Sequence, residues 1–263
     1  MTGAAGMMAL VLAEAAAGGA AFLFLTPLWN EVRRGFFFLT GGVVFVLALA
    51  AAATARVGTT SSFRMDEAII ALQLLLAMTL ATLVWLVVMA VRLRTVGRVL
   101  GIATVPLAVV MLYAFARTAA ASVPVAFFEL LAGAAFMGVV MDGLLLGHWY
   151  LTDRKLSRGP INRMAWILIA AVVLEAAAVI VGSLGDEPTT RSSDLNPLLT
   201  IAGSSTWIAL GMVACTALIA VMIRLTLRGS RPTAVQSATG FFYLAVITAF
   251  TAELAAKVGF LPS

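Results

Sequence analysis

The chain has 263 residues, of which 62% are hydrophobic and only 11% are charged, and its mean hydropathy is +1.07. Because about a quarter of the residues in water-soluble domains are charged, this composition excludes a soluble protein and predicts an integral membrane protein. At roughly 30 residues for each spanning helix and its connection, the length leaves room for about eight spans and none for a soluble catalytic domain. Any function must therefore lie within the bilayer or at its two faces.

The net charge of +5 does not indicate a nucleic-acid partner, because the basic residues lie in short breaks between apolar runs rather than in one patch. The chain contains one cysteine, Cys215, and one histidine, His148. A single cysteine excludes an internal disulfide, a CxxC pair and a Cys-ligated cluster within this chain. A single histidine excludes a bis-His haem or a multi-His metal site built from this chain alone. We therefore expect no intrinsic cofactor.

Eight apolar runs are long enough to cross about 30 Å of hydrocarbon. In chain order they cover residues 3–29, 36–55, 67–91, 99–116, 122–150, 162–184, 198–223 and 236–258. The longest polar segment, 185–197, is expected to be a single outer loop rather than a linker between domains. The sequence thus predicts an all-α, polytopic bundle of eight transmembrane helices that forms one domain over residues 1–263.

The distribution of basic residues predicts how the bundle is oriented. Arginine and lysine concentrate in the first, third, fifth and seventh breaks between spans, beginning with Arg33 and Arg34. Because basic loops stay on the cytoplasmic side, both termini are expected on the outer face of a cell inner membrane. The lipid bilayer is then the one partner that the composition itself requires.

A weak internal repeat suggests a parallel four-plus-four duplication. The stretch Glu14-Ala-Ala-Ala-Gly18 is similar to Glu129-Leu-Leu-Ala-Gly133, and four spans separate the two copies. The halves would be residues 1–118 and 119–263, with the same orientation in the membrane. Chance matches are common in spans rich in alanine, glycine and valine, so both interpretations stay open at this stage.

Acidic residues inside the spans are the most informative polar groups, since a charge at the bilayer centre costs at least about 2.5–3.5 kcal/mol. Five acids lie inside spans: Glu14, Glu129, Asp142, Glu175 and Glu253. No basic residue is expected at comparable depth, because Arg117 and Lys257 lie near the outer ends of their spans. The pattern favours proton transfer or ion binding. The alternative is that each acid makes one hydrogen bond between two helices and serves only assembly.

Two further patterns predict contacts between helices. Glu253 and Lys257 have the i, i+4 spacing of a helical ion pair, which we expect at the membrane boundary. Small residues let membrane helices approach closely, so glycines should mark the interfaces. These glycines are Gly18, Gly19, Gly41, Gly42, Gly143, Gly147 and Gly203.

The string His148-Trp149-Tyr150 ends the fifth run at the predicted cytoplasmic boundary. A histidine beside two aromatic residues at this depth is suited to a quinone headgroup, because imidazole can donate a hydrogen bond to a carbonyl. The alternative is membrane anchorage, which interfacial aromatic residues commonly provide. The three residues are therefore predicted as a cofactor-binding site for a quinone.

Three hypotheses of function follow. The first is a membrane subunit of a quinone-linked electron-transfer or proton-translocating assembly, with redox partners supplied by other membrane subunits. The second is a proton-coupled secondary transporter or exporter of a small solute or cation, which could also form a homo-oligomer. The third is a structural or assembly protein without its own chemistry. Acids that converge on one cavity would favour transport, whereas scattered acids and a cleft beside His148 would favour the quinone.

Overall fold

The structure is a computed structural model that describes residues 3–26, 28–59, 64–153, 155–185, 204–229, 233–258 and 260–261. Within these ranges the chain forms nine helices and no strand. Eight of the helices are long and apolar enough to span a membrane. The prediction of an all-α, eight-helix, multi-pass membrane protein is confirmed, and the predicted loop over 185–197 lies almost entirely outside the described residues.

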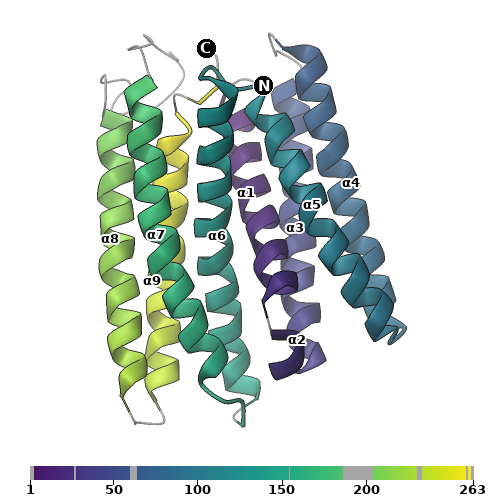
Figure 1. Cartoon of the computed structure of the whole chain (residues 1–263), viewed down its shortest axis with the longest axis vertical. Helices are drawn as coiled ribbons and strands as arrows, with labels where there is room; N and C mark the ends of the chain where they lie inside the picture. Colours follow the sequence, from purple (N-terminus) through teal and green to yellow (C-terminus); the bar gives the residue numbers. More distant parts are fainter. Residues whose placement is uncertain are drawn as a thin grey trace.

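The spanning helices stand side by side as an upright bundle (Figure 1). They are α1 (Gly3–Leu25), α3 (Arg34–Thr59), α4 (Met65–Ala90), α5 (Arg94–Ala116), α6 (Val123–Thr152), α7 (Gly159–Gly185), α8 (Ser204–Arg228) and α9 (Ala234–Ala256). The start of α1 and the end of α9 lie at one end of the bundle, which we call the termini end. The end of α6 and the start of α7 lie at the other end, which we call the opposite end.

The first predicted span, 3–29, is divided in the structure. Helix α1 ends at Leu25, and a separate four-residue helix, α2 (Leu28–Glu31), follows. The sequence explains the break, because Pro27 disfavours helical dihedral angles in the preceding residue, Thr26. The Thr26 hydroxyl donates a hydrogen bond back to the Phe22 carbonyl oxygen at 2.5 Å, which satisfies one acceptor of the last turn.

Helices α1 and α6 form the centre of the bundle. Helix α1 contacts α3, α5, α6 and α9, and α6 also contacts α5, α7 and α9. The two central helices meet backbone to backbone at Gly18 and Gly138, since a Cβ atom on either glycine would overlap main-chain atoms of the other helix. Close packing of this kind replaces the hydrophobic driving force that is missing in a bilayer.

The same cycle of contacts occurs twice in the bundle. In the first half α1 contacts α3, α3 contacts α4, α4 contacts α5, and α5 returns to α1. In the second half α6, α7, α8 and α9 contact one another in the same order. This arrangement is the one that the predicted duplication requires, and the duplication itself stays a prediction.

Most of the glycines predicted at interfaces are at interfaces. A Cβ atom added to Gly19 would overlap the side chain of Met141, and one added to Gly41 would overlap that of Trp85. Likewise, a Cβ atom on Gly143 would overlap Phe242, and one on Gly147 would overlap Thr239. The prediction is wrong for Gly42, where a Cβ atom would meet nothing within 4 Å, because this residue lies on the outward side of α3. Gly203 lies outside the described residues.

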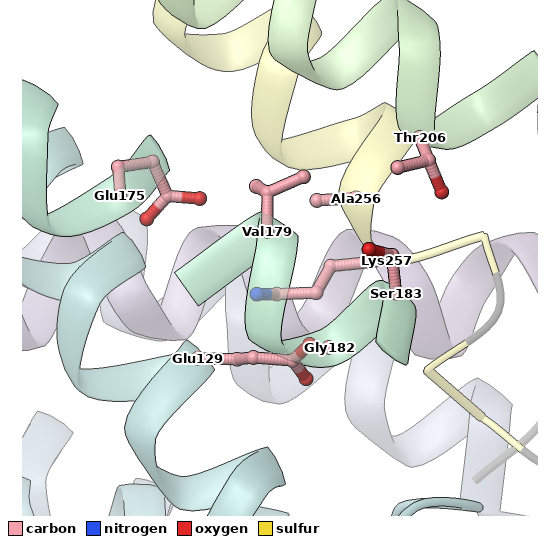
Figure 2. Close-up of a pocket in the computed structure, with 8 residues that line it drawn as sticks. All are labelled: Glu129, Glu175, Val179, Gly182, Ser183, Thr206, Ala256 and Lys257. Atoms are coloured by element: carbon pink, nitrogen blue, oxygen red, sulfur yellow. The ribbon is translucent and has the colours of Figure 1, made fainter. Parts of the chain in front are cut away.

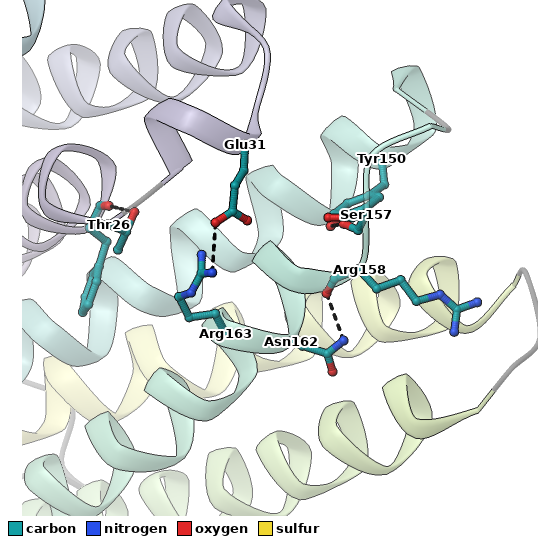
Figure 3. A network of polar contacts seen from close by, with 8 residues as sticks. Thr26, Glu31, Tyr150, Ser157, Arg158, Asn162 and Arg163 are labelled. Atoms are coloured by element: carbon teal, nitrogen blue, oxygen red, sulfur yellow. Dashed lines mark hydrogen bonds and ion pairs between the residues drawn. The ribbon is translucent and has the colours of Figure 1, made fainter.

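A network of polar contacts ties the helices together at the opposite end (Figure 3). Arg163 of α7 forms a 3.0 Å ion pair with Glu31 of α2. The Tyr150 hydroxyl donates to the Ser157 carbonyl oxygen in the connection between α6 and α7. Arg224 of α8 donates to the Asn162 side-chain oxygen at 3.0 Å. The ion pair of Arg163 with Glu31 joins the two predicted halves, and the other two contacts hold the second half together.

Candidate functional site

Lys257 directly follows the last residue of α9, and its ammonium group is buried between two carboxyl groups. Its Nζ lies 2.8 Å from Glu14 Oε1 and 3.4 Å from Glu253 Oε2. The side chain of Lys257 is 2% exposed, and those of Glu14 and Glu253 are fully buried. The predicted i, i+4 pair is therefore present, but it lies inside the protein and includes a third residue from the first helix.

The chain after α9 helps to enclose Lys257. The Phe260 ring centre lies 5.3 Å from Nζ, a distance at which the ring face attracts a cation. The Phe260 carbonyl oxygen accepts a hydrogen bond of 2.9 Å from the Ala120 backbone N–H, which precedes α6. Phe260 therefore covers the ammonium group and is held by the residue that lies three positions before α6.

Helix α6 makes room for the two carboxyl groups through Gly133. A Cβ atom on Gly133 would lie 2.7 Å from Glu14 Oε1 and 2.9 Å from Glu253 Oε2, closer than side-chain atoms normally approach. Both carboxyl groups therefore occupy the space that a larger residue would fill. Gly133, which ends the second copy of the predicted repeat, is therefore needed at this position because it leaves space for both carboxyl groups.

Two more acids complete the cluster beside a small polar cavity. The cavity has a volume of about 30 Å³, and Glu129, Glu175 and Lys257 line it together with Ser183 and Thr206 (Figure 2). Glu175 is 2% exposed and lies within electrostatic reach of Lys257, Glu253 and Glu14. A cavity needs roughly 10–15 Å³ to hold one water molecule, so this one has room for water or a small cation.

The cluster therefore contains four carboxyl groups and one ammonium group, here the acid–lysine cluster: Glu14, Glu129, Glu175, Glu253 and Lys257. Several buried carboxyl oxygens accept no hydrogen bond from any described residue, namely Glu14 Oε2, Glu175 Oε2 and Glu253 Oε1. An unpaired carboxylate is very costly in such surroundings. One ammonium group balances one carboxylate, so of the two fully buried carboxyl groups beside it, Glu14 and Glu253, one must carry a proton or attract a second cation.

The fifth predicted acid, Asp142, does not belong to the cluster. Its side chain is fully buried in α6, and neither oxygen has a hydrogen-bond partner among the described residues. It lies nine residues beyond Gly133 on the same helix, about 13 Å along the axis. The structure thus brings four of the five acids together and leaves Asp142 apart.

The structure does not bring His148, Trp149 and Tyr150 together as one site. His148 is exposed, while the buried Tyr150 donates its hydroxyl proton to the Ser157 carbonyl. Trp149 lines a cleft of about 530 Å³ at the opposite end, between the starts of α3 and α5 and the end of α6. Successive helical residues point about 100° apart. This explains why His148 is exposed, Trp149 lines the cleft and Tyr150 is buried.

Sequence reasoning did not identify Lys257 as a partner of Glu14. The expectation that no basic residue lies as deep as the acids is wrong for Lys257, which is buried against Glu14 and Glu253. The spacing from Glu253 was a signal for one ion pair, but nothing local in the sequence connects Lys257 with the first helix. Within the described residues, no group of three or more histidine, cysteine or acidic side chains is arranged to hold a metal ion.

Comparisons with known proteins give no family to which the chain can be assigned: no family model, no curated protein and no solved structure matches it. The candidate site must therefore be interpreted from its own geometry.

Proposed function

We propose that the protein is a proton-coupled secondary transporter of a small cation, and that the acid–lysine cluster is its proton-binding site. One observation carries the proposal. Acids from four helices surround one buried lysine: Glu14 of α1 and Glu253 of α9 form ion pairs with Lys257, and Glu129 of α6 and Glu175 of α7 line a polar cavity together with it. Isolated acids that served only to join helix pairs would have no reason to gather around one cation.

The charge balance of the cluster provides a mechanism for coupling. Lys257 offsets one carboxylate, and each further acid that loses its proton adds a negative charge in a buried region. A cation that enters the cavity beside Glu129 and Glu175 would offset that charge in place of the proton. Proton and cation then compete for the same carboxyl groups, which is the basic requirement of an exchanger.

The cluster takes its acids from both predicted halves, as the binding sites of many carriers do. Glu14 comes from the first predicted half, whereas Glu129, Glu175 and Glu253 come from the second. Many secondary transporters place their binding sites between repeats and move one half against the other. The close contact of α1 with α6 at Gly18 and Gly138 would be the surface on which such a movement occurs.

For the membrane orientation we keep the expectation from the sequence. The termini end faces outward and the opposite end, with Arg33 and Arg34, faces the cytoplasm of a cell inner membrane. The acid–lysine cluster then lies nearer the outer face, since Lys257 follows the end of α9.

A quinone-linked membrane subunit is the second candidate. This candidate is favoured by Trp149, which lines a cleft. Its Nε1 is buried and has no hydrogen-bond partner among the described residues. The quinone candidate has less support than transport, because the exposed His148 does not line that cleft with Trp149. Redox partners would have to come from other subunits.

Proteoliposomes test the transport function directly. The purified protein is reconstituted into vesicles with an acidic interior, and the pH gradient is followed with a fluorescent amine dye. Sodium, potassium, lithium and tetramethylammonium ions are then added outside in turn. We expect at least one of these cations to dissipate the gradient in a protein-dependent manner, because an incoming cation displaces a proton from the cluster.

Two matched acid-to-amide variants show whether the cluster is responsible. Glu253→Gln should reduce the cation-dependent signal at least tenfold, because it removes a carboxyl group beside Lys257. Glu67→Gln should retain the signal, since Glu67 pairs with Arg117 in an exposed ion pair at the same end of the bundle. Equal signals in both variants, or no protein-dependent signal with any of the four cations, would contradict cation–proton exchange.

A further inference from the structure

The cleft at the opposite end is far from the acid–lysine cluster and has a different character. Its volume is about 530 Å³, within the range of roughly 300–1,000 Å³ that is usual for ligand pockets. Val32, Phe37 and Met89 provide an apolar wall, and all three are buried. The cleft lies where helices begin and end, which is the depth of lipid headgroups.

The polar side of the cleft carries excess positive charge. The cleft is lined by three arginines, Arg33, Arg34 and Arg94. Among the described residues that line it, Asp153 is the only acid. Asp153 is already engaged, because its Oδ2 lies 3.1 Å from Arg33 Nε. Arg94 is exposed and has no ion-pair partner in the part of the chain that the structure describes. The cleft therefore has a surplus of two positive charges.

Arg34 is held in place before any ligand binds. One of its terminal nitrogens donates to the carbonyl oxygens of Met89 and Ala90 at the end of α4. The guanidinium group also lies 4.9 Å from the Phe38 ring centre. These contacts leave Arg34 Nε buried and without a hydrogen-bond partner among the described residues. A fixed guanidinium with a donor to spare is suited to a phosphate oxygen.

Trp149 adds a second unsatisfied donor to the same cleft. Its Nε1 is buried and donates no hydrogen bond within the described ranges. A buried donor without an acceptor destabilises the protein, so a ligand oxygen that reaches this nitrogen would recover part of that free energy. The cleft thus has surplus positive charge beside an apolar wall, and two of the residues that line it, Arg34 and Trp149, each carry a buried donor without a partner among the described residues.

We propose that this cleft binds a phosphate-bearing anion of the kind found in acidic phospholipid headgroups. The phosphate contacts Arg34, Arg94 and the Trp149 indole, and the apolar wall of Val32, Phe37 and Met89 contacts the glycerol region. Basic pockets between membrane helices bind anionic headgroups through the same chemistry. This inference does not depend on the transport function, because it uses none of the residues of the acid–lysine cluster.

Native mass spectrometry of the purified protein in a neutral detergent measures this binding. The protein is titrated separately with phosphatidylglycerol, phosphatidylcholine and diacylglycerol, which differ in net charge and in the phosphate. We expect one site that prefers phosphatidylglycerol at least tenfold over phosphatidylcholine and does not retain diacylglycerol. The preference should weaken in high salt, because part of it is electrostatic.

Matched variants on α5 locate the site. Arg94→Gln should reduce phosphatidylglycerol retention at least fivefold, whereas Arg98→Gln, one turn further along the helix and outside the cleft, should leave it unchanged. Arg34→Gln should also reduce it, but Arg34 holds the end of α4 through its hydrogen bonds to Met89 and Ala90. Arg94 is the cleaner test, because its side chain forms no hydrogen bond or ion pair among the described residues. Equal retention in Arg94→Gln and Arg98→Gln would overturn the proposal.

A competition experiment separates the two sources of phosphate. If inorganic phosphate at millimolar concentration displaces phosphatidylglycerol in an Arg94-dependent manner, the cleft binds free phosphate as well as the lipid. If inorganic phosphate has no effect, the site is specific for the lipid headgroup. A short-chain ubiquinone is the neutral competitor. If it displaces the lipid equally from wild-type protein and from Arg94→Gln, the cleft is a site for neutral ligands, and the proposal is overturned.

Discussion

Lys257 Nζ lies 2.8 Å from Glu14 Oε1, although Glu14 belongs to the first helix of the described residues and Lys257 directly follows the last one. The contact is fully enclosed, and Glu253 approaches the same nitrogen at 3.4 Å. A buried cation held by two acids is stable only while the charges balance. The stability and the activity of the protein should therefore both depend on this one group.

Loss of the lysine should cost more stability than loss of either glutamate. Lys257→Met leaves two or more carboxyl groups without a cation, and breaking a buried ion pair in this way costs about 3–5 kcal/mol. Glu14→Gln should cost less, because Glu253 still balances the ammonium group. Unfolding of the purified variants in SDS measures the difference, and equal losses in the two variants would argue against a shared cation.

Gly133→Ala should disturb the cluster without changing any titratable residue. The new methyl group would lie within 3 Å of the carboxyl oxygens of Glu14 and Glu253, so both must move relative to Lys257. We expect the cation-dependent proton flux in proteoliposomes to fall at least threefold. Gly211→Ala in α8 is the matched control, because a Cβ atom there meets nothing within 4 Å. Similar flux in both variants would mean that the carboxyl positions do not matter.

Gly138→Ala should destabilise the contact between α1 and α6. The Cβ atom would overlap the main chain of Gly18, which cannot rotate away as a side chain can. Overpacking of this kind costs typically about 1–3 kcal/mol, more than alanine gains from its helix propensity. Thermal unfolding in detergent checks the effect against Gly42→Ala, for which we expect no loss. A Gly138→Ala protein as stable as Gly42→Ala would contradict the backbone contact.

Asp142→Asn should have little effect on stability. The aspartate is fully buried, and its oxygens have no hydrogen-bond partner within the described ranges, so the amide removes no contact. We expect the loss in the free energy of unfolding to be clearly smaller than the value of about 3–5 kcal/mol expected for Lys257→Met, because no ion pair is broken. A loss comparable with that of Lys257→Met would instead indicate an essential interaction of Asp142.

The fold could be predicted from the sequence largely because the bilayer imposes a simple rule on composition and length. Eight apolar runs gave eight spanning helices, with ends that differ from the predicted ones by a few residues. The division of the first run at Pro27 was missed, because the run is apolar on both sides of the break. A proline near the end of an apolar run is the signal that could have revealed it.

The site could be predicted only in part. Isolated acids in apolar runs identified Glu14, Glu129, Glu175 and Glu253, since such residues are costly unless they have a role. Their convergence on Lys257 depends on how α1, α6, α7 and α9 pack, and no local pattern encodes that arrangement. The quinone prediction for His148, Trp149 and Tyr150 stays a prediction. Neighbours in sequence point in different directions on a helix, and of the three only Trp149 lines the cleft.

The central claim is that the carboxyl groups beside Lys257 exchange protons, and infrared difference spectroscopy of the reconstituted protein tests it most directly. Spectra at acid and alkaline pH are compared in the C=O stretching region of protonated carboxylic acids. We predict a pH-dependent band in wild-type protein that loses intensity in Glu253→Gln and in Glu14→Gln but is retained in the Glu67→Gln control. A pH-dependent spectrum that is identical in all four proteins would contradict the claim.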